Sequence, residues 1–274
     1  MNKKLKNSNI KFLVVGLARN CSPTIENDVL KINNALTPFG HTTWYVVESD
    51  SEDNTNEVLA SLKTKLQNFD FISLGNLRQS LPKRTERLSY CRNYYLNEIR
   101  TNKFYEDIDY VVVTDLDSVN THICEDAISS CWIRDDWDMC SANQDAPYYD
   151  IWALRHELLS PNDCWELNDF LNTITGNNQK NLIKSVFSRM IKIRQDIDWI
   201  PVESAFGGFA IYKKDVLIIG NYKGLNSNGK EVCEHVELNK ILRHNGAKLF
   251  INPKLINAKY TDHTEQLRNI DYFL

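Results

Sequence analysis

Apolar and polar residues alternate along the first 120 positions in blocks that predict strands and helices by turns. The run at 11–17 is short, apolar and rich in branched residues, which is typical of a buried parallel strand. Apolar residues then recur at helical spacing over 23–36, and the same order repeats as far as residue 114. The predicted strands are 11–17, 43–47, 69–74 and 109–114, and the predicted helices are 23–36, 58–66 and 84–100. Strands and helices in this order predict a parallel sheet covered by helices.

The rhythm changes after residue 118. Residues 146–200 are aromatic and charged without clean periodicity. Three further strands are predicted at 137–142, 204–212 and 249–252, together with a helix at 234–244. We expect one α/β domain over 1–274, in which a nucleotide-binding half at about 10–120 and a substrate-binding half at about 121–274 share one continuous sheet.

The composition of the chain excludes several classes of protein. Its 274 residues are 42% hydrophobic and 25% charged, which excludes a disordered chain. The formal net charge of −4 argues against a dedicated nucleic-acid binder. No stretch approaches the roughly 18 apolar residues that suggest an integral membrane segment. The seven cysteines form no C-x-x-C pair, so we expect reduced thiols and a cytoplasmic protein. Such a protein could also associate peripherally with a membrane.

Polar residues follow the predicted strands where each of them ends, which is where open α/β sheets bind their ligands. The most informative group is Asp115-Leu116-Asp117, directly after the strand at 109–114. Two carboxylates at i and i+2 can converge on one hard cation once the backbone turns. Mn²⁺ or Mg²⁺ held in this way neutralises the charge that builds on a leaving diphosphate. The competing interpretation is a solvated turn.

In this setting the sequence resembles the GT-A glycosyltransferases, whose D-x-D motif binds a nucleotide-sugar diphosphate through Mn²⁺ or Mg²⁺. The resemblance covers most of residues 10–263, and several further segments carry it in the expected order. These segments are VESDSEDNT at 47–55, RTERLSYCRN at 84–93, YDIWALR at 149–155, FGGFAIY at 206–212, CEHVE at 233–237 and NP at 252–253. The segments at 149–155 and 206–212 look like those of the fungal capsule-associated α-mannosyltransferases and their bacterial and viral relatives.

The resemblance implies a GT-A fold, in which a Rossmann-like nucleotide-binding half and an acceptor-binding half surround one mixed sheet. It implies a metal-dependent hexosyltransferase of polysaccharide biosynthesis, which moves a sugar from GDP-mannose or a UDP-sugar to a hydroxyl of a glycan or lipid-linked glycan. The implied donor-binding residues are Ala18, Arg19, Glu48, Asp50, Arg87, Arg92, Asn93, Asp115, Leu116 and Asp117. The implied metal ligands are Asp115, Asp117 and His263. The implied acceptor-binding residues are Tyr149, Asp150, Trp152, Arg155, Gly207 and Gly208.

Glu234 is the implied catalytic residue, either as a general base or as a carboxylate that stabilises positive charge on the sugar, and Glu237 and Asp145 compete with it. Other interpretations stay open. VVVTDLDSV at 111–119 also resembles the start of haloacid-dehalogenase phosphatases, in which Asp115 would be the nucleophile, but no later G-D-x-x-x-D motif follows. A nucleotidyltransferase would usually carry a Gly-rich loop that this chain lacks. A non-catalytic glycan-binding relative on a transferase scaffold is the last alternative.

Overall fold

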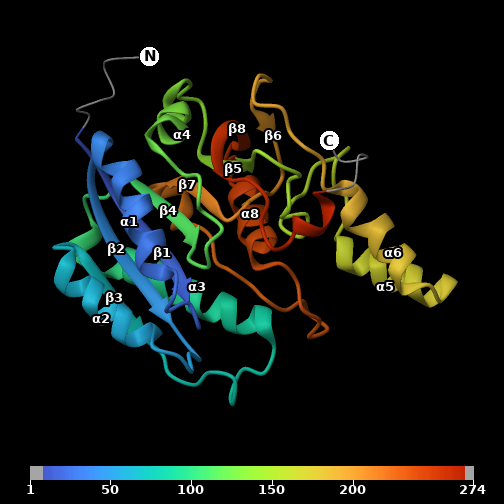
Figure 1. The fold of residues 1–274 in the computed structure, drawn as a ribbon, viewed down its shortest axis with the longest axis horizontal. Coiled ribbons are helices and arrows are strands. Elements are labelled where there is room, and N and C mark those ends of the chain that lie inside the picture. The colour runs from blue at the N-terminus through green and yellow to red at the C-terminus, as the bar shows by residue number, and fades with distance from the viewer. Residues whose placement is uncertain (1–8, 269–274) are drawn as a thin grey trace.

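The structure is a computed structural model that describes residues 9–268. These residues form one mixed sheet of eight strands in the order β3-β2-β1-β4-β7-β5-β8-β6 (Figure 1). The strands are β1 (Ile10–Ala18), β2 (Gly40–Glu48), β3 (Phe69–Ser73), β4 (Tyr110–Asp115), β5 (Met139–Gln144), β6 (Ile200–Pro201), β7 (Phe209–Lys213) and β8 (Leu249–Ala258). The α-helices are α1 (Ile25–Leu36), α2 (Thr55–Lys65), α3 (Arg84–Thr101), α4 (Glu125–Ser129), α5 (Cys164–Thr175), α6 (Asn178–Ser185), α7 (Lys214–Leu217) and α8 (Glu234–His244).

The directions of the strands decide where a ligand site can form. Strands β3, β2, β1 and β4 are parallel to one another. Strand β7 is antiparallel to both β4 and β5, and β8 is parallel to β5, so β5 and β8 point the same way as the first four. Six strands therefore end at one edge of the sheet. This is the edge at which open α/β sheets bind their ligands.

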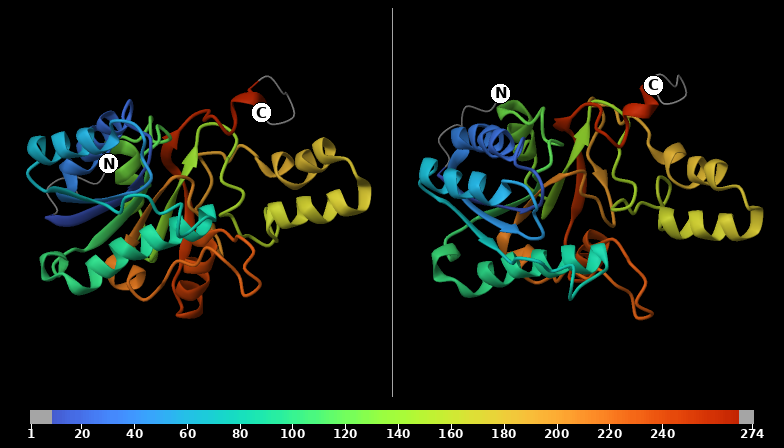
Figure 2. Two further views of the ribbon diagram at one scale, coloured as in Figure 1. Left: turned by 90° about the horizontal axis from the view of Figure 1, so that it is seen from below. Right: turned by 60° about the horizontal axis from the view of Figure 1, so that its bottom comes forward.

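Helices cover both faces of the sheet because side chains alternate along each buried strand. On β1, Phe12 and Val14 pack into a core shared with α1, α2 and α4, whereas Leu13 and Val15 pack into a core shared with α3 and α8. All four of these side chains are fully buried. Figure 2 shows the blue α1 and light-blue α2 on one side of the sheet and the teal α3 on the other. The sheet is thus the middle layer of the molecule.

The segment between β5 and β6 forms a helical hairpin, α5 and α6, that projects from the body (Figure 2). Asp163 caps α5, since its Oδ1 accepts hydrogen bonds from the first free backbone N–H groups, including that of Trp165 at 2.9 Å. Gly176 ends α5 in the left-handed conformation, with φ of 66°. Asn177 then caps α6 by accepting a bond from the N–H of Lys180. These local caps explain two helices in a region whose sequence lacks clean periodicity.

The structure confirms the predicted α/β class and the strand–helix alternation of the first half. The helix predicted at 234–244 has the predicted bounds in α8. Seven of the eight strands overlap a predicted strand, and the short β6 was not predicted. Among the described residues, no helix combines the length and the apolar character needed to cross a bilayer.

Two predicted strands are wrong in extent. The strand predicted at 204–212 begins only after Gly207 and Gly208, which have φ of 68° and 81° and turn the chain before β7. Glycine tolerates this conformation, so the pair ends one segment and aims the next. The strand predicted at 249–252 is longer than expected and continues to Ala258.

Candidate active site

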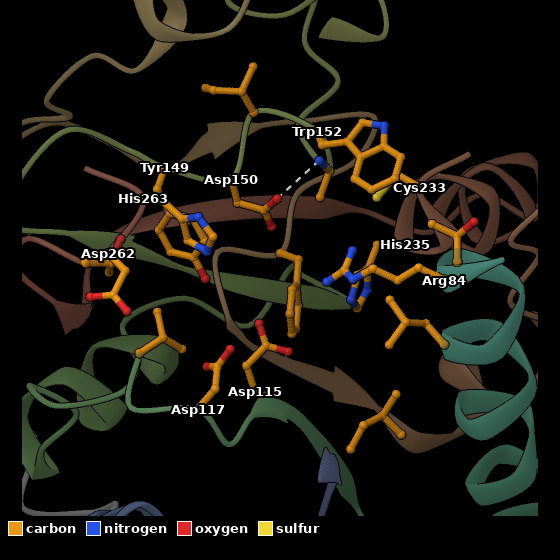
Figure 3. A pocket seen from close by; sticks show the side chains of 18 of the residues that line it. Arg84, Asp115, Asp117, Tyr149, Asp150, Trp152, Cys233, His235, Asp262 and His263 are labelled. Atoms are coloured by element: carbon orange, nitrogen blue, oxygen red, sulfur yellow. Dashed lines mark hydrogen bonds between the residues drawn. The ribbon is translucent and has the colours of Figure 1, made fainter. Parts of the chain in front are cut away.

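A cleft of about 1300 Å³ opens at the edge where the six strands end (Figure 3). Residues that follow strands line one part of it, and helix α3 and the α5–α6 hairpin supply much of the rest. The predicted or strand-end residues that line it are Ala18, Arg19, Asp50, Arg87, Arg92, Asp115, Leu116, Asp117, Tyr149, Asp150, Trp152, Asp262 and His263. The structure therefore brings most of the predicted site together from both halves of the chain.

Asp115 is the last residue of β4, and Asp117 lies two residues later. Both carboxylates reach the cleft (Figure 3), and Leu116 between them is 2% exposed. Asp28 holds this turn, because its carboxylate accepts a hydrogen bond of 2.8 Å from the backbone N–H of Ser118. Burial, and then repulsion from Asp117, raises the pKa of the Asp115 carboxyl. Burial also raises the pKa of Asp117. Two carboxylates that resist ionisation fit a divalent cation, which would relieve both the desolvation and the repulsion.

His263 lies on the loop after β8 and also lines the cleft (Figure 3). Its ring stacks on that of Tyr149, with 5.3 Å between the ring centroids. Within residues 9–268, no three His, Cys, Asp or Glu side chains converge closely enough to hold a metal ion by themselves. A cation on Asp115 and Asp117 would thus take further ligands from substrate and water. Metal ligation by His263 stays a prediction.

Arg84 is the first residue of α3, and its side chain extends into the cleft (Figure 3). Its positive charge acts on Asp117 and opposes the rise in the pKa of that carboxyl. A guanidinium at a helix N-terminus beside a pair of carboxylates is suited to a phosphate group. Sequence analysis did not select Arg84, although it begins the segment at 84–93. Its position as the first residue of a predicted helix was the available signal.

Arg87 and Asp50 line the cleft together, and their Nε and Oδ2 atoms lie 3.7 Å apart. Arg87 also donates hydrogen bonds to two backbone carbonyls of the loop before α3. Glu48 lies outside the cleft lining and is 1% exposed. Its carboxylate accepts hydrogen bonds from the backbone N–H of Ser51, at 3.0 Å, and from the hydroxyl of Ser73. Glu48 therefore shapes the loop that presents Asp50.

Arg92 is a buried guanidinium that connects the two halves of the sheet. Its Nε donates to Oε1 of Glu234 at 3.0 Å, and its Nη2 lies 3.5 Å from Oδ1 of Asp115. The rings of Phe206 and Tyr222 lie 5.5 and 5.6 Å from the guanidinium carbon. Arg92 therefore holds Glu234 and Asp115 in position at the base of the cleft, and its guanidinium is mostly engaged by these two carboxylates.

Two predicted residues lie behind the cleft rather than on its surface. Glu234 is 4% exposed, pairs with Arg92 and does not line the cleft, and neither do its competitors Glu237 and Asp145. Asn93 also lies outside the lining. Its side-chain amide donates to the Tyr222 carbonyl and accepts from the Tyr222 N–H, both at 2.9 Å. Asn93 therefore fixes the loop before α8.

Asp150 places a carboxylate in the cleft between the acidic pair and the acceptor-side residues (Figure 3). Its oxygens accept hydrogen bonds from the backbone N–H groups of Gly207, at 3.0 Å, and Ala153, at 3.3 Å. Burial raises the pKa of Asp150, and these two N–H groups offset part of that rise. A carboxylate that is fixed in position and has a raised pKa is suited to accept a proton.

The other predicted acceptor residues divide in the same way. Tyr149 and Trp152 line the cleft. Arg155 lies outside it and pairs with a carboxylate at the start of α5. Gly207 and Gly208 also lie outside the lining, and a Cβ on Gly208 would come within 2.5 Å of the Tyr149 hydroxyl. The glycine pair therefore makes room for the protein's own side chains.

His235 is a candidate that sequence analysis missed. It lines the cleft, is 4% exposed, and stacks on Phe206 with 3.8 Å between the ring centroids. Burial, and then the charge of Arg92, lowers its pKa well below the usual range, so the imidazole is neutral at pH 7. Neither ring nitrogen has a hydrogen-bond partner among residues 9–268. Both nitrogens are buried, and a neutral imidazole offers one hydrogen-bond donor and one acceptor.

Comparison with known proteins shows similarity in fold. No family model matches the chain, and neither does any curated protein sequence. The mannosyltransferase PcManGT from Pyrobaculum calidifontis, solved with GDP-Man and Mn²⁺, is similar with a TM-score of 0.53 and 14% identity. Residues 1–349 of S. aureus TarS, solved with UDP-GlcNAc, are similar with the same TM-score and identity. The chain has the GT-A fold.

The extent of these matches differs between the two sides. Each alignment covers 92% of this chain, but only 57% of the mannosyltransferase and 59% of the TarS chain. The chain therefore spans less than three fifths of the structures it matches.

Proposed function

We propose that this protein is a metal-dependent glycosyltransferase, which moves a sugar from a nucleoside-diphosphate sugar to a hydroxyl of a glycan acceptor. The observation that carries the proposal is the pair of cleft carboxylates, Asp115 and Asp117, at the end of β4 and opposite the guanidinium of Arg84. Carboxylates for a cation and a guanidinium for phosphate oxygens are the groups that a diphosphate leaving group needs. The structures similar in fold were solved with GDP-Man and with UDP-GlcNAc, so we propose GDP-mannose or a UDP-sugar as the donor.

On the donor side, the residues of this chain would hold the diphosphate and the cation at the end of β4. When bound, Mn²⁺ or Mg²⁺ supplies positive charge to the diphosphate as it leaves. Asp115 and Asp117 would bind the cation, and Arg84 would bind a phosphate oxygen from the start of α3. Arg19 and Asp50, which line the same end of the cleft, would contact the nucleoside.

On the acceptor side, we favour Asp150 over Glu234 as the catalytic base. Asp150 lines the cleft and is held by two backbone N–H groups, whereas Glu234 is engaged by Arg92 behind it. The acceptor hydroxyl would give its proton to a carboxylate oxygen of Asp150 as the oxygen attacks the sugar carbon. Tyr149 and Trp152, on either side of Asp150 in sequence, would contact the acceptor.

Two observations favour a transferase over the phosphatase alternative. The fold is the GT-A fold. In addition, Oδ1 of Asp115 lies 3.5 Å from Nη2 of Arg92, so the carboxylate is engaged by a buried guanidinium. A phosphatase of this type would form a phosphorylated Asp115. This aspartyl phosphate is labile to base, and incubation with a labelled phosphate ester detects it.

The experiment that tests the proposal is a thermal-shift screen of GDP-, UDP-, CDP- and ADP-sugars, each with and without Mn²⁺. We expect a Mn²⁺-dependent stabilisation by one nucleotide, which Asp117→Ala removes. A shift that Asp117→Ala leaves unchanged would contradict the assignment. A metal-dependent shift without hydrolysis or transfer of the sugar, over a panel of acceptors, would instead favour the non-catalytic glycan-binding relative.

A further inference from the structure

Beyond Asp150 the same cleft continues into a region of different chemistry. There it passes between the body and the α5–α6 hairpin with the short 3₁₀-helix that follows (Phe187–Arg189). We name this region the apolar arm and define it by six lining residues: Trp152, Trp165, Leu182, Val186, Phe187 and Met190.

The walls of the apolar arm combine a buried floor with accessible sides. Val186 and Met190 are 5% and 4% exposed and form part of the main core. Trp165 is 43% exposed, and Leu182 and Phe187 are partly exposed while packing against the same core. A ligand can therefore reach apolar surface here that already has a fixed support beneath it.

The polar groups that border the arm are already used within the protein. The indole N–H of Trp152 donates to Oδ2 of Asp163 at 2.8 Å, and the same oxygen accepts from Arg155 at 2.9 Å. The other oxygen of Asp163 caps α5. Arg189 donates to Asn162 and to the side chain of Ser160. Lys230, which also lines the cleft, pairs with Asp169 of α5 at 3.1 Å. Each of these charged groups therefore already has a partner within the protein.

Cys164, the first residue of α5, also lines the cleft beside the arm. The thiol of Cys164 is buried, and burial raises its pKa to about 12, so it stays neutral. Six carboxylates line the cleft, and none of them lies on the α5–α6 hairpin: Asp50, Asp115, Asp117, Asp150, Glu231 and Asp262. A sugar needs hydrogen bonds for most of its hydroxyls, and a peptide needs them for its backbone, because buried polar groups without partners are costly. A hydrocarbon chain needs none.

We infer that the apolar arm binds the hydrocarbon chain of a lipid-type acceptor. The inference rests on the proposed function, since it places the hydroxyl of that acceptor at Asp150 and its chain along the arm. Trp152 supports this direction, because it lies two residues after Asp150 and itself belongs to the arm. The acceptor is therefore amphiphilic, with its reactive hydroxyl at the polar junction and its chain under the hairpin.

The test compares octyl glucoside with methyl glucoside, both below the micelle concentration, as probes that share one polar group and differ in chain length. Trp152 and Trp165 lie in the arm, so their fluorescence reports binding directly. We expect the octyl probe to bind at least about tenfold more tightly than the methyl probe, since each buried methylene group adds affinity. Equal binding of the two probes would overturn the inference.

Adjacent residues on α6 supply a matched pair of variants. Leu182 lines the arm, whereas Ile183 is 53% exposed and lies outside the cleft lining. Leu182→Ser should remove most of the preference for the octyl probe, and Ile183→Ser should leave it unchanged. If both variants weaken octyl binding equally, the chain binds to the outside of the hairpin and the inference is wrong. Trp165→Gln, at a more exposed position, repeats the test should Leu182→Ser unfold.

A parallel measurement separates this inference from the proposed function. The Mn²⁺-dependent thermal shift with a nucleotide sugar is recorded for each variant. Leu182→Ser and Trp165→Gln should keep that shift while losing the preference for the longer chain. If the wild type binds both probes equally and still shows the nucleotide-dependent thermal shift, the inference about the apolar arm is wrong and the proposed function is unaffected. Loss of the nucleotide shift with chain preference intact would contradict the donor assignment alone.

Discussion

The two ends of the cleft use opposite means of recognition. At the end of β4, acidic and basic side chains sit in partly buried positions, and the pKa of Asp115 and of Asp117 is raised because their charges are poorly solvated. In the apolar arm, the bordering charges are neutralised by one another and the accessible surface is hydrocarbon and aromatic. The carboxylates at the first end would be stabilised by a bound cation, whereas the charges that border the apolar arm already have partners within the protein. Substitutions at one end should therefore leave binding at the other end intact.

The largest effect is expected from Asp117→Asn, which removes a charge that a cation would require. We expect sugar-transfer turnover to fall on the order of 1000-fold, since charge stabilisation at the leaving diphosphate is lost. Steady-state kinetics measure this with the donor identified by thermal shift. Asp135→Asn is the control, because Asp135 is exposed and outside the cleft lining. A similar loss in the control, or a loss of octyl-probe binding in Asp117→Asn, would break the separation between the two ends.

The junction is tested by replacing its carboxylates one at a time. Asp150→Asn should lower kcat roughly 100-fold while donor binding persists, as expected when a general base is removed. Glu234→Gln should keep a hydrogen bond to Arg92 and lose much less in kcat. The reverse order, with Glu234→Gln as the more damaging change in a stably folded protein, would restore Glu234 as the base.

Arg84→Ala should weaken nucleotide-sugar binding about tenfold, because one charge-assisted hydrogen bond to phosphate is lost. Titration calorimetry with the nucleoside diphosphate and Mn²⁺ measures it. Arg78→Ala is the matched control, since Arg78 is exposed and outside the cleft lining. The loss should shrink at high salt because Arg84 is exposed. Equal effects of the two substitutions would reduce the role of Arg84 to general surface charge.

Asp115→Asn should make the metal-free protein more stable at alkaline pH, although it harms catalysis. The folded-state pKa of Asp115 is raised above that of the unfolded chain, so the group's stabilising contribution is full below the unfolded value and is lost as pH rises through the folded value. The variant lacks this loss. Its Tm should exceed that of the wild type by a few degrees at pH 8, at roughly 2–4 °C per kcal/mol, and the difference should shrink toward pH 4. A difference that does not change with pH would contradict this account.

The smallest effect is expected from His235→Phe. The stack on Phe206 survives and two buried nitrogens without partners are removed, so the Tm should hold or rise slightly. Loss of one neutral hydrogen bond to a sugar hydroxyl should raise a substrate KM by roughly threefold. An unchanged KM for both donor and acceptor would remove His235 from the site.

Sequence patterns located the donor end better than the acceptor end, and the reason is physical. Asp115 and Asp117 follow a continuous apolar strand, and parallel strands end at one edge, so local pattern and topology agree there. The positions of Glu234 and Arg92 depended on a pairing across 142 residues, which no local pattern encodes. Because of that pairing, Glu234 lies behind the cleft. Arg92 still lines the cleft, but its guanidinium is bound to Glu234.

The hairpin shows the other limit of prediction from sequence. No helix was predicted within residues 146–200, although Asp163 and Asn177 cap α5 and α6 there. The apolar arm arises from tertiary placement of Trp165, Leu182 and Phe187, which are far from β4 in sequence. Likewise, Gly207 and Gly208 were predicted to bind the acceptor, but they lie outside the cleft lining, and the atoms that approach them belong to the protein.

The α5–α6 hairpin lies within one segment of the chain, between β5 and β6, and each of these strands pairs with β8 without it. Such a segment is a natural unit for exchange in engineering and in evolution. Replacing the hairpin by one of another length would lengthen or shorten the apolar arm. The pairing of the strands, and the cleft residues at their ends, would stay the same. Acceptor range could thus diverge rapidly among proteins of this architecture at nearly constant donor chemistry.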